Sequence, residues 1–434
     1  MSSLADRIRG IVGSAGGHVA PPLQANLPQP HADVAAVLGG EWRDCDGCNC
    51  FVVDRRWDRS ARHGRDDVGV MAERLEQASA DATLFAAGAP ARPPFVFFDL
   101  ETTGLSGGAG THAFLVGCGW FDADAAFVTR QFVLTRYTDE RALLETVARE
   151  LVRAGALVSF NGKSFDAPML ETRYLFHRLA WIGGRIPHID ALHPARRFWG
   201  KNVECSLIAL EKQVLGMRRA GDVAGFEIPA RYFQFVRSGD AHPLVAVLEH
   251  NRLDLLTLAA LTARLLHLAQ GGPDVARDGR EVYALGTVYA RAGLDARARE
   301  CYARAVDMSP APPGAFDPLR IDSLRALALA WRRARQYDQA AVHWRQLLDI
   351  RGCPAPIRRE AAEALAIHHE HRVRDLAAAK AFALRSLEPE MPPSWTQAVK
   401  HRLARIERKL DGRKSRVTIP TSVQTLDLGL LTRD

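Results

Sequence analysis

Between residues 95 and 270, short apolar runs of strand length alternate with amphipathic stretches of helix length. "FVFFDL" predicts a buried strand, and "HAFLVGCGWF" and "FVTRQFVL" follow it at the spacing of a hairpin. The helical stretch "DERALLETVARELVRAG" then precedes another buried strand, "ALVSFN", and a second helix, "APMLETRYLFHRLA". Three strands, a helix, a strand and a helix in this order predict an α/β domain in which a mixed sheet is flanked by helices.

A different pattern begins after "QGGPDVARDG" (270–279), because the chain to about residue 410 is helical in pattern and rich in alanine. Small and aromatic residues recur there at positions of the tetratricopeptide consensus, where small residues let two helices approach and rings fill the groove between them. The pattern occurs three times, and the third copy matches less well than the first two. The matching residues are Leu285, Gly286, Tyr289, Ala298, Tyr302, Ala305 and Pro310 in the first copy; Leu327, Ala328, Trp331, Ala340 and Trp344 in the second; and Leu365, Ala366, Ala378 and Phe382 in the third. We therefore predict an all-α, tetratricopeptide-like repeat domain over residues 280–410, with a generic helical bundle as the alternative.

The remaining segments are shorter and less regular. Residues 1–39 are rich in glycine, proline and alanine, and predict a poorly ordered N-terminal arm. Residues 40–94 contain the plausible strand "CFVVDRRW" and end in "AAGAPARPP", which has the composition of a linker, so we expect a small β-containing segment there. Residues 411–434 are expected to form a C-terminal tail.

The overall composition narrows the class of protein without fixing a function. A net charge of +7 and a pI near 9.2 permit a polyanionic partner such as nucleic acid but do not require one. The N-terminus has charges where a signal peptide would be apolar, and the longest apolar run, 255–269, is too short to span a bilayer. Four of the seven cysteines are scattered singly, which fits a reducing compartment. We therefore expect a cytoplasmic protein that does not enter the membrane.

Three short segments carry acidic residues in positions that suit metal binding. Asp99 and Glu101 lie one residue apart at the end of the first buried strand, so both point to one face, where two like charges are unfavourable without a cation. Mg²⁺ or Mn²⁺ is the natural candidate, because both ions prefer oxygen ligands. Asp166 precedes a helix, and His250 and Asp254 lie four residues apart on another helix. Taken singly, the three segments have ordinary alternatives, namely a surface turn, a helix cap and a surface contact.

Taken together, the three segments resemble the motifs of a known nuclease family. "FDLETTGL", "NGKSFDAPML" and "HNRLD" resemble the three exonuclease motifs of the DEDD family, whose fold is ribonuclease H-like. With the repeats appended, the arrangement resembles the YprB-type ribonuclease H-like proteins with a tetratricopeptide tail. The resemblance covers residues 95–270 well and residues 280–390 in part. It implies a mixed five-stranded sheet flanked by helices, followed by an all-α domain.

The resemblance also implies a role for each acidic residue. Asp99, Glu101, Asp166 and Asp254 would hold two divalent ions, Mg²⁺ or Mn²⁺, and His250 would orient or deprotonate the attacking water. The third motif departs from the family pattern in its spacing. Members that use histidine generally place it five residues before the aspartate, whereas the four-residue spacing seen here belongs to members with tyrosine. His250 therefore stands in the tyrosine position.

Residues beside the motifs are candidates for substrate binding. Thr102, Thr103 and Gly104 offer backbone and hydroxyl groups to a 3′-terminal nucleotide, and a tight connection that merely needs glycine is the alternative. Further candidates are Asn161, Lys163, Arg196 and Arg197. The lysine and the two arginines among them would contact phosphates.

Two other features have weaker functional interpretations. Asp190, in "HIDALH", is either a further polar group of the site or a helix cap, and we favour the cap. The cluster "CDGCNC" suggests zinc, with His63 as a fourth ligand, but its spacing is not that of a standard knuckle. We therefore favour incidental cysteines in a hairpin, which are Cys45, Cys48 and Cys50.

The sequence thus favours a metal-dependent 3′–5′ exonuclease that acts on single-stranded ends of DNA or RNA. Its repeat domain would bind a protein partner or brace the nuclease. The alternative is a repeat-based interaction protein whose nuclease fold is catalytically weak or inactive and serves in nucleic-acid binding. An endonuclease that uses the same metals is a third possibility.

Overall fold

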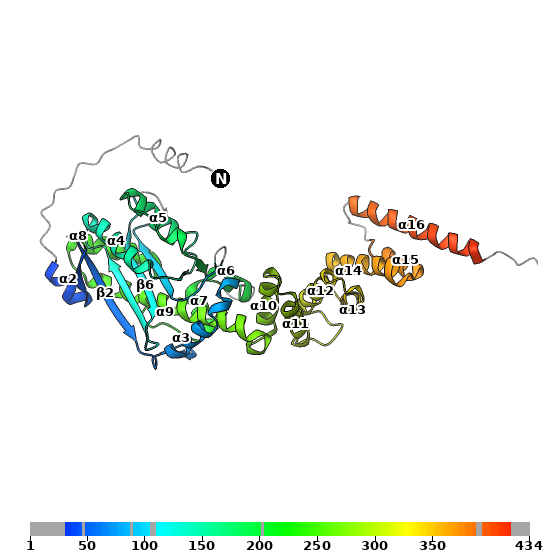
Figure 1. Ribbon diagram of the computed structural model, residues 1–434, viewed down its shortest axis with the longest axis horizontal. Helices are drawn as coiled ribbons and strands as arrows, with labels where there is room; N and C mark the ends of the chain where they lie inside the picture. Colours follow the sequence, from blue (N-terminus) through cyan, green and yellow to red (C-terminus); the bar gives the residue numbers. More distant parts are fainter. Residues whose placement is uncertain are drawn as a thin grey trace, which may run out of the picture.

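The computed structural model describes residues 31–45, 48–86, 90–104, 110–200, 204–387 and 393–417. Figure 1 shows an α/β body at one end of the molecule and a row of helices, α10 to α16, that leads away from it. Most of the predicted N-terminal arm and of the C-terminal tail lies outside the described residues. Among the helices that are described, none has the length and apolar character needed to cross a membrane.

A single seven-stranded sheet forms the centre of the body. Its strands, in spatial order, are β1 (Glu41–Cys45), β2 (Cys48–Trp57), β7 (Phe127–Val133), β6 (Ala113–Phe121), β5 (Phe95–Thr102), β8 (Ala156–Ser159) and β9 (His188–Asp190). The pairs from β1 to β5 are antiparallel, whereas β8 runs parallel to both β5 and β9. The sheet is therefore mixed, as predicted.

The predicted mixed sheet of the α/β domain is confirmed, and it is wider than expected. Strands β5 to β9 are the five expected between residues 95 and 270, and β1 and β2 extend the sheet beyond β7. The run "CFVVDRRW" was predicted as a strand of a separate small segment, but its pairing partner lies 76 residues away, between Asp54 and Arg130. Strand propensity does not identify such a distant partner. In the linker stretch before β5, Ala91 is buried and Ala86 bridges to Ile189, so part of it packs on the body.

The two faces of β5 belong to different apolar clusters. Val96, Phe98 and Leu100 join one with residues of α4, α5 and the start of α9, whereas Phe95 and Phe97 join another with the leucines of α9 from residue 255 on. The alternation follows from the two-residue period of a strand. The helices of the body, in chain order, are α2 (His31–Leu38), α3 (Val68–Gln77), α4 (Glu140–Leu151), α5 (Asp166–Phe176), α6 (Leu192–Phe198), α7 (Leu207–Leu210), α8 (Ile228–Ser238) and α9 (His242–Gly271).

Helix α9 links the body to the helical row. Its C-terminal half packs in the same apolar cluster as the first two helices of the row, and the Tyr289 hydroxyl donates a hydrogen bond to the Ala269 carbonyl at 2.7 Å. A buried Glu281 carboxylate accepts hydrogen bonds from Trp199 at 3.0 Å and from Arg264 at 2.6 Å. The apolar core and these polar contacts therefore continue across the junction.

The row consists of helical hairpins, as the repeat pattern predicted. Gly286 on α10 allows close packing, because a Cβ atom there would lie 2.8 Å from the Tyr302 ring on α11. The assignment of these hairpins as tetratricopeptide repeats stays a prediction. Their helices are α10 (Gly279–Arg291), α11 (Asp295–Asp307), α12 (Pro318–Arg333), α13 (Tyr337–Asp349), α14 (Ala355–His368) and α15 (Leu376–Arg385), followed by α16 (Pro393–Val417).

The aromatic core of the sheet gives a first stability prediction. Phe97 is fully buried and its ring contacts Phe121 and Phe127. We expect Phe97→Ala to lower the free energy of unfolding by about 3–5 kcal/mol, because the substitution leaves a cavity that the sheet cannot close. Phe226→Ala is the control, since that ring is 85% exposed. Urea denaturation measures both variants, and an equal, small effect in the two would contradict the assigned core.

Candidate active site

The site begins where the apolar part of β5 ends. Asp99 and Glu101 share the strand face of Phe95 and Phe97, the face that packs against α9. Both carboxylates are only partly exposed. The sequence prediction that the two point together thus agrees with the strand geometry, and the sheet places them opposite the middle of α9.

A side chain from α9 reaches the first carboxylate across the sheet. Asn251 is fully buried and its Nδ2 donates to Asp99 Oδ2 at 2.9 Å. Gly117 lies directly across from Asp99 on β6, and a Cβ atom at this glycine would collide with the Asn251 side chain. A glycine is therefore needed at residue 117 to let the amide approach the acidic pair.

The second motif forms a tight turn between β8 and α5. Asn161 adopts a left-handed backbone conformation, with φ at 67°, and Asp190 accepts hydrogen bonds from the backbone N–H groups of Asn161 at 2.8 Å and Lys163 at 3.2 Å. A Cβ atom at Gly162 would lie 2.8 Å from Asp166 Oδ2, so this turn packs closely on the carboxylate. Asp190 also accepts from Leu192 N at 3.1 Å, but the residue before α6 is Ala191 and no side chain caps that helix, so the favoured capping role is wrong and Asp190 instead ties the second-motif turn to the start of α6.

Asp166 is the first residue of α5 and is 6% exposed. The capping alternative for it is wrong, because the residue before the helix is Phe165 and no side chain caps the helix. A carboxylate placed at a helix start without a capping bond is available for other ligands.

The third motif lies within α9. His250 and Asp254 fall one helical turn apart, and His250 Nε2 lies 3.4 Å from Asp254 Oδ2. The other ring nitrogen, Nδ1, lies 2.8 Å from Asp222 Oδ1. Asp222 stays ionised, since hydrogen bonding from His250 and the charge of Arg219 outweigh the effect of partial burial and lower its pKa. An ionised carboxylate only accepts, so His250 Nδ1 carries a proton and donates it to Asp222.

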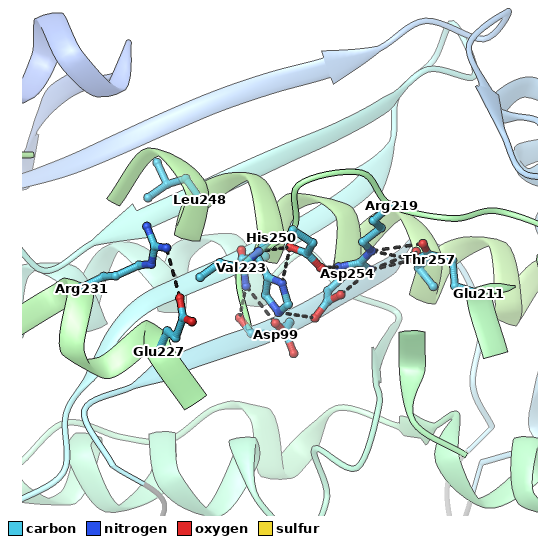
Figure 2. A network of polar contacts seen from close by, with 12 residues as sticks. Asp99, Glu211, Arg219, Val223, Glu227, Arg231, Leu248, His250, Asp254 and Thr257 are labelled. Atoms are coloured by element: carbon cyan, nitrogen blue, oxygen red, sulfur yellow. Dashed lines mark hydrogen bonds and ion pairs between the residues drawn. The ribbon is translucent and has the colours of Figure 1, made fainter. Parts of the chain in front are cut away.

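A buried arginine that the sequence patterns did not reveal is bound to Asp254. Figure 2 shows Arg219 between Asp254 and Glu211, beside Thr257. Its Nη2 lies 2.5 Å from Asp254 Oδ1 and 2.7 Å from Glu211 Oε2, and its Nη1 lies 3.1 Å from Asp222. The Arg219 side chain is 3% exposed and that of Glu211 1%. Arg219 is therefore a fixed internal cation at one end of the acidic site.

The carboxylates repel one another strongly. Burial, followed by repulsion from Asp254, Glu101 and Asp166, raises the pKa of Asp99 well above its usual value. Burial, followed by repulsion from Asp254, Asp166 and Asp222, raises the pKa of Glu101, and burial with Asp190 nearby raises that of Asp166 to about 7. These shifts show that the predicted acidic residues lie close enough to interact and that Arg219 alone does not balance their charge.

The donor set fits hard divalent cations in charge and in ligand type, because all four groups offer carboxylate oxygens. Within the described ranges, however, no three histidine, cysteine, aspartate or glutamate side chains are arranged to hold one metal ion. The partners of Asp254 account for part of this difference. Arg219 contacts one of its oxygens and His250 faces the other.

The candidate substrate residues are placed differently from one another. The Thr102 hydroxyl donates to the Gly104 carbonyl at 3.0 Å, and that of Thr103 accepts from His112 N at 3.0 Å, so both hydroxyls brace the turn after β5. A Cβ atom at Gly104 would meet nothing within 4 Å, so packing does not demand glycine there. Residues 105–109 of this glycine-rich loop lie outside the described residues. Asn161 is exposed and Lys163 is half-buried in the second motif.

Arg196 and Arg197 on α6, which were predicted to contact phosphates, differ in burial. Arg196 is exposed, whereas Arg197 is partly buried, and its pKa is lowered by burial and by neighbouring Arg291 of α10. Arg197 therefore faces the helical row and has no contact with the acidic cluster among the interactions described for it.

The zinc interpretation of the cysteine cluster loses its fourth ligand. His63 is buried and its Nε2 lies 3.0 Å from the Thr257 hydroxyl on α9. Cys50 is buried in β2, and the side chains of Cys45 and Cys48 lie outside the described ones.

Sequence reasoning missed four residues of the site. Asn251 lies inside the third motif but has no role in its pattern, and the rest lie between recognised segments where no periodicity marks them, namely Glu211, Arg219 and Asp222. The available signal was three charges within five residues, "RRAGD", in the connection that precedes α8 and α9.

Comparison with known proteins gives two matches. A sequence model described as the RNase_H superfamily matches residues 96–266, which include all three motifs. YprB of Bacillus subtilis (strain 168), described as an uncharacterized protein, is 30% identical to this chain over 372 residues, which are 83% of this chain and 86% of YprB. The similarity to YprB therefore extends through most of the helical row.

The raised pKa of Asp166 predicts a pH-dependent cost in the absence of metal. Below about pH 4 this carboxyl is protonated in both the folded and the unfolded chain. Between about pH 4 and pH 7 the unfolded chain has lost the proton while the folded chain still holds it, so stability falls over this range. We expect Asp166→Asn in chelator to be more stable than the wild type by about 2 kcal/mol near pH 8 and equal to it near pH 4. Denaturant titration at both pH values measures this, and equal stability near pH 8 would contradict it.

The buried position of Arg219 predicts a large penalty for its removal. Arg219→Gln leaves Glu211 buried without its counter-charge, which should cost about 3–5 kcal/mol of unfolding free energy. Adding Glu211→Gln to it removes the uncompensated carboxylate, so the double variant should be more stable than Arg219→Gln alone. Urea denaturation of the three variants gives the coupling energy. An additive double variant would show that the pair is not coupled.

Proposed function

The chain belongs to the YprB family and carries a ribonuclease H superfamily domain, and from that premise we propose that it is a metal-dependent 3′–5′ exonuclease acting on single-stranded ends of DNA or RNA. The observation that carries the proposal is the convergence of four mutually repelling carboxylates from three segments of the chain, Asp99, Glu101, Asp166 and Asp254. Buried like charges of this kind are retained where a cation is to be bound.

The proposed ligands are the four carboxylates, with Mg²⁺ or Mn²⁺ as the ions. A pair of such ions supplies activation of water on one side of a phosphodiester and neutralisation of the departing 3′ oxygen on the other. His250 accepts the proton of the water at Nε2, and Asp222 holds the imidazole in the required tautomer through Nδ1. The hydrogen bond that the Asn251 amide donates to the Asp99 carboxylate holds this proposed metal ligand against α9.

Substrate binding is assigned to the turns around these ligands. The backbone of Thr102, Thr103 and Gly104 borders the end of β5, and Asn161 and Lys163 border the start of α5. A terminal nucleotide between the two turns would place its phosphate beside the carboxylates and near the Lys163 ammonium. The helical row would bind a protein partner, since stacked hairpins expose grooves that fit a peptide.

A specific observation favours a second candidate function. Both oxygens of Asp254 face internal partners, Arg219 and His250, so the acidic site is partly satisfied without metal. This favours an interaction protein with a catalytically weak or inactive nuclease fold that binds nucleic acid. Calorimetric titration with Mn²⁺ separates the two functions. An inactive scaffold would show no specific binding that Asp166→Ala removes.

The exonuclease proposal predicts metal-dependent shortening of labelled oligonucleotides. Single-stranded DNA and RNA carrying a 5′ label should give ladders in Mg²⁺ or Mn²⁺ and no digestion in chelator. Asp99→Asn and Asp254→Asn should lower the rate by at least about 100-fold, because each removes a proposed ligand. Asp124→Asn is the matched control, on a turn between β6 and β7 where its side chain is 83% exposed. Digestion that is equal in all variants, or absent in every metal, would overturn the proposal.

A further inference from the structure

A hollow of about 350 Å³ lies in the helical row, between α13 and α14 and far from the acidic site. Its apolar lining comes from Ala340, Ala341 and Trp344 on α13 and from Ala364 and Ile367 on α14. The three alanines leave the space, because their short side chains lie where the two helices face each other. Trp344 is 2% exposed and closes the bottom of the hollow.

Cationic and imidazole side chains form the rim of this hollow. Arg332 comes from the end of α12, and His371 and Arg372 come from the π-type turn η7 (His369–Val373) that follows α14. The Arg372 guanidinium lies 4.2 Å from the centre of the Tyr337 ring, which holds the charge over the opening. The described lining therefore contains two arginines and no acidic side chain.

The nearest carboxylates do not neutralise this rim. Asp338 lies 3.6 Å from His368 Nε2, but its side chain is 93% exposed and points into solvent. Glu370 lies 3.5 Å from His371, yet its carboxylate is already bound by Arg405 and Lys409 of α16 at 2.8 Å each. The positive charge of the rim is thus available to a ligand.

One polar atom in the wall of the hollow also lacks a partner. The His368 side chain is 9% exposed, and its Nδ1 atom has no hydrogen-bond partner among the described residues. Buried polar atoms in folded proteins are nearly always paired.

We propose that this hollow between α13 and α14 binds an acidic peptide segment of a partner protein, with one apolar side chain of the peptide inserted between the alanines above Trp344 and its carboxylates on Arg332 and Arg372. The proposal rests on the partner-binding part of the proposed function and does not depend on nuclease activity. Each half of the hollow specifies one half of the ligand. The apolar floor selects an aliphatic or aromatic anchor, and the basic rim selects acidic neighbours of that anchor.

The same features argue against single-stranded nucleic acid as the occupant. Proteins bind such strands largely by letting successive bases stack on exposed aromatic side chains, usually several in a row along a groove. Here Trp344 is buried as a floor, and Arg372 already lies over the Tyr337 ring. The hollow is also narrow, with alanines in its walls above Trp344, which suits one compact side chain.

A binding titration with the full chain tests this proposal. The probe is a fluorescein-labelled peptide with one central leucine flanked by glutamates, measured by fluorescence anisotropy. We expect saturable binding that weakens when the leucine becomes alanine and disappears when the glutamates become lysines. Arg372→Glu reverses the charge at the rim, and Ala364→Leu fills the hollow at a partly exposed position. Each variant should weaken binding by at least about tenfold.

Matched controls make the result decisive. Arg304→Glu applies the same charge change at an exposed position on α11, outside the hollow, and should leave affinity within about twofold. Thermal melting of each variant checks that it is folded.

Equal affinities for Arg372→Glu and Arg304→Glu, or equal binding of the lysine peptide, would overturn the proposal. Binding of a labelled oligothymidine that Arg372→Glu and Ala364→Leu abolish would instead assign the hollow to nucleic acid. The oligonucleotide digestion assay tests nuclease activity independently of peptide binding, so the exonuclease proposal and the peptide-binding proposal can fail separately.

Discussion

The concentration of buried negative charge at the end of β5 is the constraint to which the rest of the body is fitted. Asp99 and Glu101 continue a strand face that is otherwise aromatic, and Asp254 and Asp166 add further charge to it. Hydrogen-bond donors from neighbouring elements of the body stabilise these carboxylates. Asn251 reaches one carboxylate past a glycine, and Arg219 neutralises another while held by the buried Glu211. The geometry of α9 and of the loop before α8 follows from these contacts.

Local patterns predicted those parts of this protein that depend on local chemistry. The strands and helices between residues 95 and 270 follow from apolar periodicity, and the acidic residues were identifiable because each ends a strand or begins or occupies a helix in a recognisable motif. Long-range pairing was not predictable in this way. The joining of β2 to β7 and the contact of Arg219 with Asp254 depend on where distant segments meet, and no residue in "RRAGD" differs in type from an ordinary charged loop.

Two polar clusters within the described residues lie beside a π-type turn. Glu211 begins the turn η4 (Glu211–Leu215), which ends at the left-handed Gly216, and His371 and Arg372 belong to η7, which ends at the left-handed Arg374. A π-type turn inserts an extra residue into a helical turn and so redirects the side chains that follow, and such turns are frequent at functional sites. In this chain one such turn carries the carboxylate that binds Arg219, and the other carries basic groups at the rim of an apolar hollow.

Helix α9 makes the acidic site and the first hairpin mechanically inseparable. It runs without interruption from His242 to Gly271, and its last turns share an apolar core with α10 and α11. From Asp254 to Ala269 the helix rises by about 22 Å, so a small tilt imposed at the row reappears as a displacement at the carboxylates. Cutting the chain after residue 271 would uncover Leu265, Leu266 and Leu268 to water. The boundary in the sequence pattern therefore falls inside a continuous apolar core.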